Sequence, residues 1–163
     1  MKKIIAGISV TLLLSITAWA QQKESIELRS TAEVDVVSTN AKGEKEVNRV
    51  DVAKAKVLPG DTVFFMTAYT NIGKQPADTV VITNPVPEHM VYADKSAEGK
   101  GTRIEFSVDG GKSYAARDKL MVTDAQGKKR AATVADYTHI KWIVIKPVTP
   151  GAKGSVSFKA KLE

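Results

Sequence analysis

The sequence predicts an all-β domain, an antiparallel β-sandwich of about seven to nine strands. Apolar and polar residues alternate along several runs, as they do in strands that have one buried face. Turns rich in glycine and proline separate these runs, and no stretch after residue 20 has the period of an amphipathic helix. Strands joined by short turns favour two antiparallel sheets packed face to face.

The first 20 residues predict a signal peptide. Lys2 and Lys3 form its positive start, residues 4–16 its apolar stretch, and Ala18-Trp19-Ala20 its cleavage motif. Because the apolar stretch is shorter than the ~20 residues of a membrane span, we expect cleavage instead of anchoring. The mature domain, residues 21–163, is then exported to the periplasm, the cell surface or the medium, with no membrane span left.

The composition restricts the chemistry that this domain can carry. The chain has 163 residues and a formal net charge of +6, two units of which come from the leader residues Lys2 and Lys3. This size suits one domain with its own core. The absence of cysteine excludes disulfides and thiol chemistry. A charge this mild gives no indication of nucleic-acid binding.

The mature chain begins with a long predicted strand. From Ile26 to Val36 apolar residues occupy the even positions, which indicates a strand with one solvated face. A polar loop follows at residues 39–45. In Val47–Val57, Val50 and Val52 share one parity whereas Ala53, Ala55 and Val57 share the other, and we expect a bulged strand there in preference to a short helix.

The stretch 57–87 reads as turn, strand, turn, strand, turn. Pro59-Gly60 opens it, since proline presets φ and glycine accepts positive φ. Two runs rich in β-branched and aromatic residues follow, at residues 63–70 and 79–83, with a loop at 71–76 between them. Pro85 and Pro87 end the second strand because proline has no N–H for a ladder.

The second half of the chain continues the pattern. After a small polar loop at 94–101, a strand at 104–108 leads into a hairpin turn at Asp109-Gly110-Gly111, followed by a less regular segment to Thr123. Two more strands end the chain. The expected core residues of this half are Tyr114, Leu120, Val122, Ile140, Trp142, Val144, Val156, Phe158, Ala160 and Leu162.

Several of these motifs occur together in a known family. They are the turn Pro59-Gly60-Asp61-Thr62-Val63, a loop and strand with Asn71, Gly73, Pro76, Ala77, Val80, Val81 and Thr83, then Pro85, Pro87 and Tyr92, and near the end Ile140-Lys141-Trp142 and Pro150-Gly151. With them, residues 57–163 resemble the conserved-repeat (DUF11) domain of bacterial surface proteins. The resemblance implies an immunoglobulin-like sandwich without catalytic residues. The chain departs from that family at Asn84, where aspartate is usual, and at Phe64 and Met66, where threonine is usual, and it carries one copy where tandem repeats are the rule.

Phe64 and Met66 form the first candidate interaction surface. If Val63, Phe65 and the residues alternating with them face the core, Phe64 and Met66 point out of the sandwich. Either the N-terminal segment covers them, or they mark a surface for a partner strand or subunit.

The loop Lys128-Lys129-Arg130 is a second candidate, since together with Lys112 and Arg117 it could form a basic patch for an anionic glycan or lipid. The alternative is a solvated loop tip, which is the more common role of a short run of charges.

A third motif is structural. Ser107, Asp109, Gly111 and Tyr114 fit an Asp-box hairpin, in which the aspartate accepts local backbone N–H groups and the aromatic ring packs beneath the turn.

No constellation for catalysis or metal binding is recognisable. His89 and His139 are the only histidines, no ligand spacing joins them, and no serine has a paired base. We therefore expect no cofactor and no enzyme activity, and a structural, adhesive or protein–protein interaction role, with another envelope protein or a second copy as partner. The alternative is an envelope carbohydrate-binding module that uses Tyr92, Tyr114 or another exposed aromatic residue as a platform, and a small hydrolase ranks last.

Overall fold

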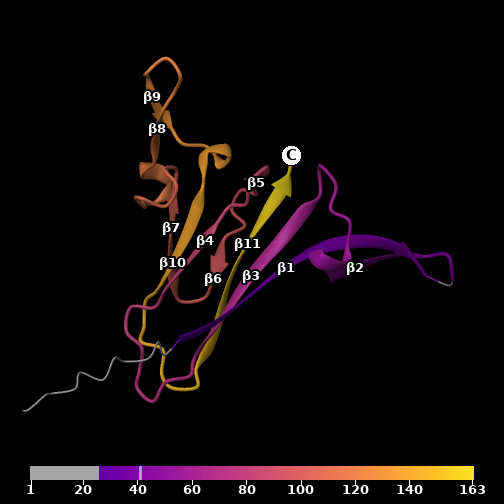
Figure 1. Cartoon of the computed structure of the whole chain (residues 1–163), viewed down its shortest axis with the longest axis horizontal. Helices are drawn as coiled ribbons and strands as arrows, with labels where there is room; N and C mark the ends of the chain where they lie inside the picture. The colour runs from indigo at the N-terminus through magenta and orange to yellow at the C-terminus, as the bar shows by residue number, and fades with distance from the viewer. Residues whose placement is uncertain (1–25, 41) are drawn as a thin grey trace, which may run out of the picture.

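The structure, a computed structural model, describes residues 26–40 and 42–163. This part of the chain contains eleven strands, three 3₁₀ helices and no α-helix (Figure 1). The all-β prediction is confirmed, and the sheets are antiparallel, as a β-sandwich requires. The predicted signal peptide, residues 1–20, lies outside the described residues. Within those residues, no helix is both long enough and apolar enough to cross a membrane.

A large sheet forms one layer, with the strand order β2-β1-β3-β11-β5 and with β6 paired to β11. Its strands are β1 (Ile26–Thr39), β2 (Lys45–Asp51), β3 (Thr62–Asn71), β5 (Met90–Tyr92), β6 (Glu98–Gly99) and β11 (Lys153–Leu162). The centre of this sheet is β3, which pairs with β1 on one side and with β11 on the other.

A smaller sheet forms the second layer, in the order β4-β10-β7, and a separate hairpin is made by β8 and β9. The bounds are β4 (Val81–Pro85), β7 (Thr102–Ser107), β8 (Met121–Thr123), β9 (Lys129–Ala131) and β10 (His139–Val144). The 3₁₀ helices are η1 (Val52–Lys54), η2 (Arg117–Lys119) and η3 (Val134–Asp136). The strand count exceeds the prediction because β5, β6, β8 and β9 have only two or three residues each.

The core lies between the two sheets. Trp142 and Ile140 of the small sheet are fully buried, and Val156, Phe158 and Ala160 of the large sheet meet them. All five were expected inside from their alternation, and that expectation is confirmed. Leu120 is also buried, whereas the other expected core residues of the second half, Tyr114, Val122, Val144 and Leu162, are half-buried.

The segment after Val47 differs from its prediction. The strand β2 ends at Asp51, and the carboxylate of Asp51 accepts a hydrogen bond from the Ala53 N–H at 2.8 Å. That bond caps the 3₁₀ turn η1. The expected bulged strand is therefore wrong, because an aspartate at this place satisfies the backbone of a helical turn and explains the change of apolar parity.

Candidate functional site

The most exposed part of the large sheet is a hairpin that extends past β3. The pairing of β1 with β3 stops at Val34, which lies opposite Val63. From there β1 runs on to Thr39 and pairs with β2 alone. We call residues 35–39 of β1, together with β2, the arm. Figure 1 shows the arm reaching away from the remaining strands at the right of the view.

The arm carries apolar side chains that the described residues leave uncovered. Val37 and Val47 lie opposite each other in the ladder and are 61% and 66% exposed. Val36, whose side chain lies on the other face of the arm, is exposed too. A two-stranded hairpin is marginally stable by itself, and contiguous exposed apolar side chains mark interaction sites. The pair Val37–Val47 is therefore the leading candidate contact.

Polar contacts define the tip and the base of the arm. At the tip, the Asn40 side-chain oxygen accepts hydrogen bonds from the N–H groups of Lys42 and Glu44, at 2.9 and 3.0 Å. At the base, Arg49 donates to both carboxylate oxygens of Asp35, at 2.8 and 3.1 Å. This hydrogen bonding holds the pKa of Asp35 below its ordinary value. The arm thus has its own turn and its own cross-strand ion pair.

Phe64 and Met66 lie on the outer face of the large sheet, where both are half-buried. The strand β1 does not lie across them. It is their in-plane neighbour, with Glu33 opposite Phe64 and Thr31 opposite Met66. The ring of Phe64 is covered in part by the guanidinium of Arg49, at 4.8 Å from the ring centroid. Phe64 therefore contacts the base of the arm, and because both residues are half-buried they do not form a bare patch.

The hairpin after β7 shows a closed set of local hydrogen bonds. Asp109 accepts from the N–H groups of Lys112 and Ser113, both at 3.0 Å, and from the hydroxyls of Ser107 and Ser113, at 2.7 and 2.6 Å. The Ser107 hydroxyl accepts from the N–H of Gly111 at 2.9 Å. The hydrogen bonds from Ser113 are the main cause that keeps the pKa of Asp109 well below its ordinary value. Each carboxylate oxygen is occupied within the turn, which leaves no oxygen free of a protein partner.

Tyr114 closes the same turn. Its hydroxyl packs against Gly111, where a side chain would not fit well, since an added Cβ would lie 3.0 Å from the hydroxyl oxygen. Gly111 also has a φ of 83°. The ammonium of Lys141 stands 4.3 Å from the ring centroid. The side of the Tyr114 ring that faces Lys141 is consequently covered, and the residue as a whole is half-buried.

The predicted basic loop is part of the β8–β9 hairpin. Lys128 and Lys129 are exposed, but Arg130 forms two hydrogen bonds with Asp136, at 2.7 and 2.8 Å. The guanidinium of Arg117 is likewise paired, with Asp94. Two of the five basic groups expected in a patch are therefore neutralised by carboxylates.

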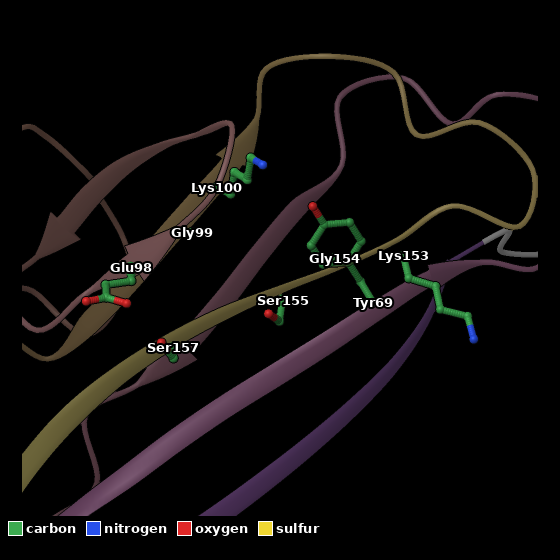
Figure 2. Close-up of a pocket in the computed structure, with 8 residues that line it drawn as sticks. All are labelled: Tyr69, Glu98, Gly99, Lys100, Lys153, Gly154, Ser155 and Ser157. Atoms are coloured by element: carbon green, nitrogen blue, oxygen red, sulfur yellow. The ribbon is translucent and has the colours of Figure 1, made fainter.

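A polar hollow of about 380 Å³ lies at the start of β11. Figure 2 shows Tyr69 standing between Lys100, in the β6–β7 turn, and Lys153, with Glu98 at the other end. The ring of Tyr69 lies against Gly154. A Cβ added to Gly154 would lie only 2.3 Å from the Tyr69 hydroxyl oxygen. Tyr69 is only 6% exposed, so it lines the hollow with an edge and not with a stacking face.

The remaining predicted residues have structural surroundings. Tyr92 is 2% exposed, and its hydroxyl accepts a hydrogen bond from the Ala97 N–H at 2.9 Å, so Tyr92 offers no ring to a sugar, contrary to the carbohydrate-binding alternative. His89 is exposed, while His139 is half-buried beside the Thr138 hydroxyl, at 3.3 Å. Within residues 26–40 and 42–163, no three acidic or histidine side chains gather as metal ligands would.

Comparison of the chain with protein-family models, curated proteins and solved structures finds no match. The functional argument therefore rests on the geometry of the arm. Sequence reasoning missed the arm, although one signal was present. The adjacent valines Val36 and Val37 break the period-two alternation, so one valine points to each face of the strand.

Proposed function

We propose that this protein is an exported, non-enzymatic, immunoglobulin-like module with a protein–protein interaction role at the cell envelope, structural or adhesive in kind. The observation that carries the proposal is the arm, on which Val37 and Val47 form an uncovered cross-strand pair. Exposed apolar residues on a projecting hairpin gain stability when a partner covers them.

The immunoglobulin-like class and the relation to the conserved-repeat family are part of this proposal. Two antiparallel sheets that enclose Trp142 support the first, and the motifs of residues 57–163 support the second. Export is supported by the leader motif in residues 1–20. Modules of this kind bind through loops and sheet edges, which agrees with a contact through the arm.

The test compares partner capture by the wild-type protein with capture by a variant of the arm. The double substitution Val37→Thr and Val47→Thr keeps β-branched shape and removes apolar surface. Ile145→Thr is the matched control, because Ile145 is 69% exposed and lies off the arm.

We expect a stoichiometric envelope partner to be captured by the wild type and the control and to be lost with the arm variant. Circular dichroism should show all three proteins equally folded. Equal capture by all three would overturn the proposal.

The second candidate function is binding of an anionic glycan. The hollow favours it, since Lys100 and Lys153 are both among its lining residues and could attract an anionic ligand. Titration with a sulfated or uronic-acid oligosaccharide, followed by the amide signals of Gly99 and Gly154, tests this role. Shifts that disappear in Lys153→Gln would support it, and unchanged signals would exclude it.

A further inference from the structure

Below the arm, β1 has a bare edge. The strand β2 pairs with β1 only from Glu33 to Thr39, and β3 occupies the opposite side of β1. Along residues 26–32 no strand of the described chain pairs with the other edge. An unpaired strand edge is a template for another strand.

The hydrogen-bond pattern shows which backbone groups point to that edge. The Asn71 N–H donates to the Ala152 carbonyl at 3.0 Å, and the Asn71 carbonyl accepts from the Gly151 N–H at 2.8 Å. The odd residues of β3 therefore bond toward β11 and its even residues toward β1. Through the register, Glu27 and Arg29 bond to β3, while Leu28 and Ser30 direct N–H and C=O to the bare edge.

We propose that a second copy of this chain adds its β1 antiparallel to this edge, with Leu28 opposite Leu28 of the partner subunit. The two copies would share one continuous sheet around a two-fold axis. Leu28 is 51% exposed, and it borders a hollow of about 340 Å³ with Ile26 and Val81. The partner's Leu28 would cover this apolar surface.

The charges of β1 select this register. A two-fold axis perpendicular to the sheet brings like faces together, so a symmetric pair of strands is centred on one residue. Centring on Glu27 places two glutamates opposite each other, and centring on Arg29 places two arginines opposite each other. Centring on Leu28 puts Glu27 opposite Arg29 of the partner subunit at both ends, so opposite charges face each other. Of these three registers it is the one without like-charge contact.

The same charges are free to change partners. Within one chain, Arg29 contacts Glu27 at 3.0 Å, and their side chains are 78% and 41% exposed. Exposed ion pairs contribute little to stability, so exchanging this contact for one across the interface costs little. The register needs only residues 26–30 of each copy, which end before β2 begins its pairing at Glu33.

This inference rests on the proposed function, because it names one partner for the interaction role. It uses the edge of β1 and not the arm valines. Loss of the dimer would therefore leave capture of another partner by the arm intact, and the two can fail separately.

The experiment is a charge swap followed by sedimentation equilibrium and light scattering of the exported, purified protein. The variants are Glu27→Arg, Arg29→Glu and the double substitution. Glu88→Arg and Lys161→Glu are matched controls, since each makes the same charge change at an exposed site away from the β1 edge.

We expect a wild-type dimer whose dissociation constant rises about tenfold or more in each single variant, because like charges then face each other. The double swap restores opposite charges and should restore the wild-type dissociation constant, with the controls unchanged. A monomeric wild type overturns the inference. So does a dimer that the single variants leave unchanged, or a double variant no tighter than the singles.

Discussion

The guanidinium carbon of Arg49 lies 4.8 Å from the centroid of the Phe64 ring, and this contact joins the arm to the outer face of the large sheet. The same guanidinium holds Asp35 across the hairpin at 2.8 Å. Arg49 thus connects three strands, β1, β2 and β3, at the point where the sheet narrows to two. Arg49 therefore contributes to the orientation of the arm, beside the packing of the buried Val34.

Phe64→Thr should loosen the arm without unfolding the domain. An exposed cation–π contact contributes about 0.5–1 kcal/mol, so amide exchange in β2 should quicken about two- to fivefold. Hydrogen exchange of Asn48 and Val50, whose N–H groups point toward β1, followed by mass spectrometry or NMR measures this. Met66→Thr is the control, because Met66 lies on the same face of β3 but two residues further from the arm. Equal acceleration of amide exchange in both variants would show that general packing, and not the Arg49–Phe64 contact, holds the arm.

Asn71→Ala should destabilise the fold strongly. The Asn71 amide donates to the carbonyls of Gln75 and Val148, at 2.8 and 2.7 Å, and its oxygen accepts from the Gly73 N–H at 2.8 Å. The residue is 1% exposed, so its loss leaves buried backbone groups unpaired. We expect about 2–3 kcal/mol less stability in urea denaturation.

Asn48→Ala gives the contrast for that measurement. The Asn48 amide also donates a hydrogen bond, to the Ser38 hydroxyl at 3.0 Å, but both residues are exposed on the arm. Its loss should change stability by at most about 0.5 kcal/mol. Similar losses for the two variants would refute a special role for Asn71.

Gly154→Ala should introduce overpacking at the edge of the core. A Cβ at this position would lie 2.3 Å from the Tyr69 hydroxyl, and Gly154 pairs directly with Tyr69 in the ladder. We expect a cost of about 1–3 kcal/mol in thermal or urea unfolding. Combining it with Tyr69→Leu should cost less than the sum of the two single changes, because the shorter side chain makes room. Additive costs would locate the strain elsewhere, and Ser155→Ala serves as the neighbouring control.

Stability should fall in acid through Asp109. Its pKa in the folded protein lies below the ordinary aspartate value of about 3.9, since the Ser113 and Ser107 groups bind the carboxylate. A depressed pKa stabilises the fold fully above the unfolded-state pKa, and this contribution is lost as pH falls toward the folded-state pKa. Asp109→Asn should therefore be less stable than the wild type at pH 6, and the difference should shrink below about pH 4. A difference independent of pH would argue against this account.

Local alternation of apolar and polar residues predicts the two layers of this fold, but it does not predict the arm. Period two places Trp142 and Phe158 in the core because each belongs to a strand covered on one face only. The same pattern runs through β1 without a break between its paired part and the arm. Whether Val37 is covered depends on where β3 begins, and that is set by the turn before Thr62, which lies far along the sequence from Val37. Very short strands such as β6 cannot be predicted from the sequence, because two residues carry no pattern and are a strand only through their pairing with β11.

The candidate site was harder to predict than the core. Phe64 and Met66 face outward, as the alternation predicts, but Phe64 is covered in part by Arg49, which is distant in sequence and which no sequence motif marks. Ser107, Asp109 and Ser113 contact one another over a few residues, so that turn could be anticipated from spacing alone. Contacts between neighbours in sequence are thus predictable, whereas contacts across a sheet need its register.

The place of β11 has a consequence for how quickly the chain can fold. This last strand lies inside the large sheet, between β3 and β5, and its partner β3 comes from the first half of the chain. Joining them closes a long loop, whose entropy must be overcome before the ladder gives any stabilisation. Folding is therefore expected on the slow time scale of proteins rich in non-local pairings. Until Lys153–Leu162 takes its place, the edge of β3 and the apolar side chains of both layers stay open to solvent, which makes this interval the one most prone to aggregation.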